Sequence, residues 1–122
     1  MQNAGRAGER AAEKEARRRG MTVLERNLVA GGNEIDLVAL DGEVLVFIEV
    51  KARRTDSHGA PEEFVDSGKQ RRIIRAARAF LKHKRLLDRR RRYDIAAVRL
   101  DAKGRAENVR WTEAAFDEGD VP

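Results

Sequence analysis

The sequence NEIDLVALDGEVLVFIEVKARR, residues 33–54, decides the fold of this 122-residue chain. It holds the most strongly apolar run of a polar protein in which 39% of the residues are charged. Asp41-Gly42 divides it into two segments with strand pattern, 34–40 and 43–51, and Asp-Gly is a strong hairpin signal. The stretch therefore predicts an antiparallel hairpin with a two-residue loop at Asp41-Gly42.

The side chains of this hairpin alternate between two faces, and directly opposed residues share a face. One face is wholly apolar and consists of Ile35, Leu37, Ala39, Val44, Val46, Ile48 and Val50. The other face is apolar near the turn, where it carries Val38, Leu40, Leu45 and Phe47. Its open end carries only polar residues, which are Glu34, Asp36, Glu49 and Lys51. The sorting supports the register, because a slip by one residue would mix the two faces.

In this register, Glu34 lies opposite Glu49, and Asp36 lies opposite Phe47 and diagonal to Glu49. The simpler interpretation is a hairpin with one face in water, but that predicts polar residues along the whole face. The apolar half indicates instead that another element covers it and that the carboxylates lie at the edge of a cleft. Clustered carboxylates repel each other, so one of them can hold its proton. A divalent cation relieves that repulsion, and hard oxygen ligands suit Mg²⁺.

The rest of the chain predicts helices before and after the hairpin and further strands. In chain order we expect a helix at 4–19, a strand from Met21, a turn at 30–32, a loop at 52–64, a helix at about 67–84, a strand at 93–100, a short strand at 107–111 and a ragged tail from Thr112. These elements predict one α/β domain, residues 1–122, with a central mixed sheet flanked by helices. Its ends, residues 1–4 and 117–122, are the parts that can be mobile.

The inner stripe of the first helix consists of Ala12 and Ala16 and includes Glu9. This stripe has small side chains, so the helix packs either closely or weakly. Near the other end of the chain, we expect Trp111 and Phe116 to attach the C-terminal segment to the core.

The composition predicts a soluble, cytoplasmic protein. The chain has no cysteine, which excludes a disulfide scaffold and a cysteine zinc site. It has no apolar run long enough to cross a membrane and no apolar signal-peptide centre at the N-terminus. The net charge is +5, and residues 82–92 carry seven Lys or Arg and one Asp. This basic run predicts either contact with a nucleic acid or a solvated basic face without a partner.

The ordered set of motifs is similar to a known family. EID, followed after twelve residues by EVK, resembles the D…(D/E)-x-K signature of the restriction-endonuclease-like, or PD-(D/E)XK, nuclease superfamily. More of the chain resembles the uncharacterised YraN-like bacterial family of that superfamily. The similar segments are GERAAE (8–13), LERN (24–27), EIDLVA (34–39), VFIEVKAR (46–53), Gly59, GKQRRI (68–73), RYDIAAV (92–98) and VRW…AF (109–116).

The resemblance implies a restriction-endonuclease-like fold, similar to archaeal-type Holliday-junction resolvases, and a set of residue roles. Asp36 and Glu49 match the metal-binding carboxylates, and the main-chain carbonyl of Val50 would be a further ligand for Mg²⁺ or Mn²⁺. Lys51 matches the lysine that positions or activates the attacking water. Glu9 matches an acidic residue that some relatives bring to the same catalytic site. Relatives that resolve junctions act as dimers, so a homodimer is also implied.

The activity that these roles imply is metal-dependent hydrolysis of DNA phosphodiester bonds by an endonuclease, on branched or processed DNA. The alternative is a non-catalytic nucleic-acid-binding module or partner protein that retains the carboxylate cluster. The residues expected to contact the nucleic acid are Lys69, Arg89, Arg90, Arg91 and Arg92. For Lys69 a packing role stays open, and for Arg92 a structural ion pair with Asp94 stays open.

Overall fold

The computed structural model of the protein describes residues 2–54 and 65–120. Five strands form one sheet in the order β1-β2-β3-β4-β5, with the bounds β1 Thr22–Ala30, β2 Asn33–Asp41, β3 Val44–Arg54, β4 Arg91–Leu100 and β5 Ala106–Phe116. The β3–β4 pair is parallel and the other three pairs are antiparallel. A parallel pair needs a crossover connection, and helix α2, Ser67–His83, lies between β3 and β4 in the chain. The predicted α/β class is confirmed, and the arrangement is consistent with a restriction-endonuclease-like fold.

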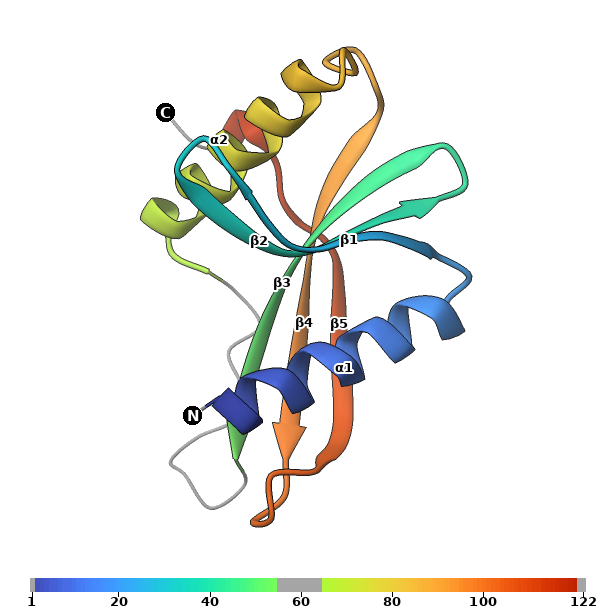
Figure 1. Ribbon diagram of the computed structural model, residues 1–122, viewed down its shortest axis with the longest axis vertical. Coiled ribbons are helices and arrows are strands. Elements are labelled where there is room, and N and C mark those ends of the chain that lie inside the picture. Colours follow the sequence, from blue (N-terminus) through green and yellow to red (C-terminus); the bar gives the residue numbers. More distant parts are fainter. Residues whose placement is uncertain (1, 55–64, 121–122) are drawn as a thin grey trace.

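The two helices bury opposite faces of this sheet. Figure 1 shows α1, Gln2–Arg18, crossing β3, β4 and β5, whereas α2 lies near the turn between β1 and β2. The apolar cluster under α2 contains the strand residues Ile35, Val38, Leu45, Phe47, Tyr93 and Ile95. The cluster under α1 contains the strand residues Leu37, Ala39, Val46, Ile48, Ala96, Val98 and Leu100. Both faces of the hairpin 33–54 are therefore covered, which explains its unusually apolar composition.

Helix α1 packs closely on the sheet, as its small inner stripe allows. Ala12 and Ala16 are fully buried. At Gly8 the approach is closer still, because a Cβ atom built there would lie 2.8 Å from the Cβ of Ala52 in β3. Of the two outcomes that the small stripe allows, the structure has the close packing.

The predicted hairpin exists, but its register differs by one pair. Asp41 pairs with Val44, and Leu37 pairs with Ile48, so the loop residues are Gly42 and Glu43 rather than Asp41 and Gly42. Gly42 has a φ of 61°, which glycine adopts without strain. The shift moves each partner by two residues, so most side chains keep their predicted face. Phe47 now pairs with Val38 instead of lying opposite Asp36, which follows one residue beyond the last pair, Leu37 with Ile48.

The C-terminal segment, predicted to be an irregular tail from Thr112, forms regular secondary structure as far as Asp120. Strand β5 is eleven residues long and continues to Phe116, and a 3-10 helix follows at Glu118–Asp120. Phe116 stacks on Tyr93 with the ring centroids 5.2 Å apart, and Trp111 Nε1 donates to the buried Asp94 carboxylate at 2.8 Å. The predicted attachment by the two aromatic residues is confirmed, and the prediction of a tail from Thr112 was wrong because these contacts extend the strand.

The loop predicted at 52–64 begins later than expected. Strand β3 continues to Arg54, which pairs with Leu100 of β4, and residues 55–64 lie outside the described part of the chain. Gly59 of the family motifs lies in this segment. Among the described residues, neither helix is both long and apolar enough to cross a bilayer.

Candidate functional site

The candidate site lies where strands β2 and β3 separate. Their last ladder pair is Leu37 with Ile48. Beyond it, the backbone N–H of Val50 donates to Oδ2 of Asp36 at 2.7 Å. The carboxylate of Asp36 therefore takes the place of a main-chain acceptor between the two strands, and Glu49, on the neighbouring strand, is directly beside it.

A local reversal of the strand pattern positions Asp36. Leu37 packs under α1 and Ile35 packs under α2, although two residues apart they would normally share a face. Our prediction that Ile35 shares the face of Leu37 was therefore wrong. The residue that the register places beside Asp36 on β1 is Asn27, and its φ of 50° is rare outside glycine and most tolerated by Asn and Asp. The alternation of side chains between the two faces is thus reversed at Asn27 in β1 and at Asp36 in β2. Asp36 itself lies between the two faces.

The two carboxyl groups at this point resist ionisation. Glu49 is only 8% exposed, and its burial, together with the negative charge of Asp36, raises its pKa to about 7. Burial also raises the pKa of Asp36, opposed by the hydrogen bond from Val50 and by the charge of Lys69. The pair is suited to share a proton, or a cation, near neutral pH.

Two lysines provide positive charge beside the pair. Lys69 Nζ lies 3.6 Å from Oε2 of Glu49, and the positive charges of Lys69 and Lys51 both lower the pKa of Glu49. Lys69 is in the first turn of α2, which is fixed by Asp66. The Asp66 carboxylate accepts the backbone N–H of Lys69 at 2.8 Å and caps the helix. The sequence left open whether Lys69 contacts a nucleic acid or has a packing role. The structure adds a third possibility, because Lys69 directly contacts Glu49 of the carboxyl pair.

Glu9 reaches the same region from α1. Burial raises its pKa, and the negative charges of Asp36 and Glu34 raise it further. With its amide nitrogen facing the carboxylates, Asn27 donates to Glu34 at 3.1 Å and to Glu9 at 3.3 Å. Glu34 thus contacts Asn27 rather than facing Glu49. Asn27 was missed as a site residue in the sequence, although its tolerance of positive φ was a usable signal.

The carboxylate oxygens of Asp36 and Glu49 are chemically suited to a small divalent cation, although two side chains are few ligands. Two adjacent, poorly solvated carboxyl groups repel when both are ionised, and oxygen ligands suit Mg²⁺ or Mn²⁺. Across residues 2–54 and 65–120, no group of three or more His, Asp or Glu side chains is arranged to hold a metal ion. Within the described residues, the side chains of Asp36 and Glu49 could bind it directly, with water, substrate or main-chain oxygens completing the ligand set.

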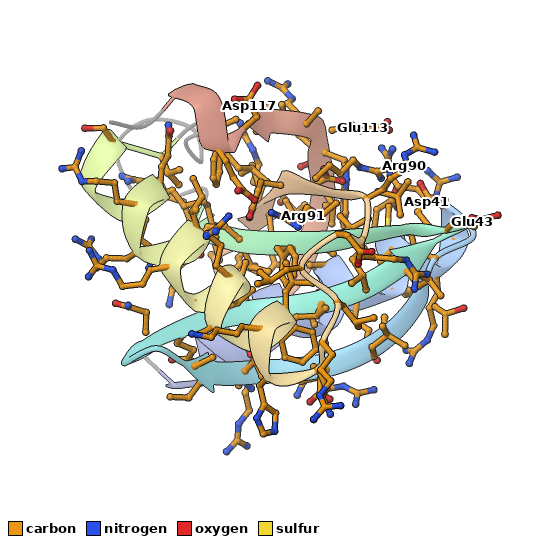
Figure 2. All side chains as sticks on the ribbon, turned by 90° about the horizontal axis from the view of Figure 1, so that it is seen from above. Asp41, Glu43, Arg90, Arg91, Glu113 and Asp117 are labelled. Carbon is orange, nitrogen blue, oxygen red and sulfur yellow. The ribbon has the colours of Figure 1, made fainter. Side chains whose placement is uncertain are left out.

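The basic run at the start of β4 is mostly bound to other parts of the protein. Arg92 contacts the buried Asp94 at 3.0 Å and Asp41 at 2.9 Å, and Arg91 contacts Glu118 at 2.6 Å. The side chains of Arg91 and Arg92 are each 16% exposed. Arg89 Nε donates to the carbonyl of Glu43. Figure 2 shows Arg91 toward the interior and Arg90 near the hairpin loop at the periphery, so the structural alternative is favoured for Arg92.

Asp94 forms a second group of polar contacts, and the sequence predicted only one of them, the possible ion pair with Arg92. It is fully buried and accepts hydrogen bonds from Arg92, from Trp111 and from the backbone N–H of Ala114. Ala114 has a φ of 51°, an unusual conformation that its bond to Asp94 stabilises. These contacts join β4 to β5 and indicate a structural role for the pair Arg92–Asp94.

Comparisons with known proteins agree with the family resemblance. The model of the uncharacterised protein family UPF0102 matches residues 8–98. A UPF0102 protein of Syntrophotalea carbinolica is 43% identical over 93% of this chain and 90% of its own length. One from Desulfosudis oleivorans is 41% identical over 95% and 91%, and one from Hahella chejuensis is 43% identical over 92% and 88%. This chain therefore belongs to the uncharacterised protein family UPF0102.

Proposed function

We propose that this protein is a Mg²⁺- or Mn²⁺-dependent endonuclease of the restriction-endonuclease-like superfamily that hydrolyses phosphodiester bonds in DNA. One observation carries the proposal. The buried Glu49 and the half-buried Asp36 lie side by side where β2 and β3 separate, and two lysines adjoin them. Although Lys69 lies 3.6 Å from Glu49, burial and the charge of Asp36 still raise the pKa of Glu49 to about 7, and carboxyl groups perturbed in this way are concentrated at functional sites.

Each residue of this group has a role in the proposed reaction. The carboxylates of Asp36 and Glu49 would hold the cation, together with the main-chain carbonyl of Val50. When bound, Mg²⁺ lowers the pKa of a coordinated water and neutralises phosphate oxygens. Lys51 would donate a hydrogen bond to the attacking water, and Lys69 would stabilise negative charge on the phosphate. Glu9 would orient water at the side of Asp36 that faces α1.

Cleavage assays test the proposal directly. Branched, flapped and single-stranded DNA are incubated with the protein and Mg²⁺ or Mn²⁺. We expect cleavage of at least one substrate by the native protein and a loss of at least about 100-fold with Asp36→Asn, because one ligand is weakened and the pair loses one of its two negative charges. Asp88→Asn makes the same change at an exposed residue and should cleave normally. Equal rates for the native protein and Asp36→Asn would contradict the proposal.

A non-catalytic nucleic-acid-binding module is the second candidate. It is favoured by the small ligand set, since no group of three or more His, Asp or Glu side chains among the described residues is arranged to hold a metal ion. Calorimetric titration of the protein with Mg²⁺ and Mn²⁺ distinguishes the two candidate functions. The endonuclease requires metal binding that is weakened by Glu49→Gln, whereas the binding module predicts DNA binding without a metal and without cleavage of any substrate.

A further inference from the structure

We infer that the outer surface of α1 is a binding surface for a nucleic-acid backbone, separate from the carboxyl pair and from the four arginines 89–92. Two hollows adjoin this surface and share Arg10 and Lys14. One, of about 330 Å³, extends from α1 to the turn between β4 and β5, at Gly104–Ala106. The other, of about 520 Å³, extends from α1 to Arg26 of β1. We call these two hollows together the α1 groove.

The α1 groove is strongly cationic. Arg10, Lys14 and Arg105 line the first hollow, and its other residues are Ala7, Ala11, Gly104 and Ala106. The second hollow is lined by one carboxylate, Glu13, and by four cationic side chains, which are Arg10, Lys14, Arg17 and Arg26. Glu13 is saturated, because Arg17 and Arg26 both bind it. Positive charge therefore remains in excess in both hollows.

Of the cationic side chains that line the α1 groove, Arg10 and Lys14 are not neutralised by a carboxylate of the described residues. Both are exposed, and no ion pair or hydrogen bond of either side chain occurs among the described residues. By contrast, Arg17 and Arg26 bind Glu13, and Arg105 contacts Asp101 at 3.3 Å. Arg10 and Lys14 are four residues apart on the helix, where like charges repel and destabilise it slightly. A bound polyanion would remove that repulsion.

A nucleic-acid backbone fits this surface better than a membrane or a protein does. Binding to a membrane interface uses large apolar residues such as Trp, Phe or Leu, and protein interfaces centre on buried aromatic or Arg anchors. The apolar side chains lining the α1 groove are all alanines. From Arg10 to Arg17 the helix rises about 10 Å, which is about three nucleotide steps along one strand of a duplex. Exposed cations without apolar anchors are typical of phosphate contacts.

The α1 groove and the carboxyl pair lie on two sides of the same helix. Glu9 accepts a hydrogen bond from Asn27 of β1, whereas the next residue, Arg10, is exposed and lines the groove. A nucleic acid in the groove is thus held beside the proposed site but not in it. The identification of the polyanion as nucleic acid rests on the proposed function, but the binding itself requires neither metal nor cleavage.

The test compares two double variants of equal charge. Arg10→Gln/Lys14→Gln removes one Arg and one Lys from the α1 groove. Arg71→Gln/Arg75→Gln removes two Arg from the exposed face of α2, outside the basic run 82–92. Binding of a short fluorescein-labelled DNA duplex is measured by anisotropy in EDTA, over a series of NaCl concentrations, after thermal unfolding has shown that both variants fold.

We expect the α1 variant to bind at least about tenfold more weakly than the native protein, and its salt dependence to fall by about two phosphate contacts, with a slope change of about 1.8. The α2 variant should retain most of the affinity. Equal losses in the two variants, unchanged binding by the α1 variant, or no binding by the native protein at low salt would each overturn the inference. Loss of cleavage in Asp36→Asn with normal binding in EDTA would leave the inference standing, so the two proposals fail independently.

Discussion

At the scale of single residues, the main feature of this protein is a pair of carboxyl groups that only the fold brings together. Asp36 and Glu49 are thirteen positions apart in the chain. Glu49 is nearly buried, and the loss of hydration together with the charge of Asp36 raises its pKa to about 7. Ionised Glu49 is therefore unfavourable in the folded protein, and this has a measurable consequence.

Without divalent metal, Glu49 should destabilise the protein as the pH rises. The folded pKa is about 7 and the ordinary value is 4.5, so between these pH values the folded state binds more protons than the unfolded state. The free energy of unfolding then falls as the pH increases toward 7. Glu49→Gln keeps the shape of the neutral acid, and we expect it to raise the free energy of unfolding at about pH 8 by on the order of 2 kcal/mol.

This prediction is measured by urea unfolding in EDTA. The gain from Glu49→Gln should shrink as the pH is lowered toward 4.5, where the folded native protein holds the proton on Glu49. Glu43→Gln makes the same change in the exposed hairpin loop and should alter the stability little at either pH. A loss of stability in Glu49→Gln at high pH would indicate that the ion pair with Lys69 dominates over burial.

At the scale of elements, the close approach of α1 to β3 places Glu9 beside Asp36. The approach depends on Gly8, whose added Cβ would lie 2.8 Å from Ala52 Cβ. Gly8→Ala should therefore push α1 away from the sheet. We expect it to lower the free energy of unfolding by about 1–3 kcal/mol, because overpacking outweighs the better helix propensity of alanine.

The matched substitution for this prediction is Gly5→Ala in the same helix. Its added Cβ would have no neighbouring atom within 4 Å, so the change should be neutral or stabilise the protein by less than about 1 kcal/mol. Urea unfolding of the two variants separates packing from propensity. If Gly8→Ala were as stable as Gly5→Ala, α1 would have room to move, and the position of Glu9 would not be fixed by this contact.

At the scale of the whole molecule, Glu118 joins the C-terminal segment to two other elements. Its carboxylate accepts hydrogen bonds from Tyr93 at 2.7 Å and from Arg91 at 2.6 Å in β4, and from Arg78 in α2 at 3.1 Å. The bond from Arg91 is the largest cause that lowers the pKa of Glu118 to about 2. These contacts hold β4, α2 and the last turn of the chain in one unit.

Glu118→Gln should weaken this connection in a pH-dependent way. Because the folded pKa of about 2 is below the ordinary value of 4.5, the ionised group stabilises the protein fully above pH 4.5, and this contribution disappears as the pH falls toward 2. We expect the variant to lose about 1–2 kcal/mol at neutral pH, reduced from the full shift because the side chain is partly exposed. Urea unfolding should show a smaller difference from the native protein at about pH 3.

Glu107→Gln is the comparison, since Glu107 is an exposed residue of β5 and its replacement should change the stability little at either pH. A similar loss in both variants would point to net charge rather than to the contacts of Glu118.

By itself, the sequence determined the elements around the hairpin and the identity of the carboxylates. Period-two alternation and the Asp-Gly turn predicted two strands whose clustered apolar side chains, except Ile35, lie on the expected faces, because strand geometry depends on neighbouring residues. The length and pattern of 67–84 likewise predicted α2. Local patterns of this kind could not predict the end of β5, which depends on the contacts of Phe116 and Trp111 with residues of β4.

Only the tertiary structure decided how the candidate site is built. The register shift that places Asp36 beside Glu49, the reversal at Asn27, and the approach of Lys69 and Glu9 all depend on contacts between segments distant in the chain. It also distinguished the arginines, since Arg91 and Arg92 are held by Glu118 and Asp94, whereas Arg10 and Lys14 remain exposed. A sequence shows where charges occur, but which charges neutralise one another depends on distances that exist only after folding.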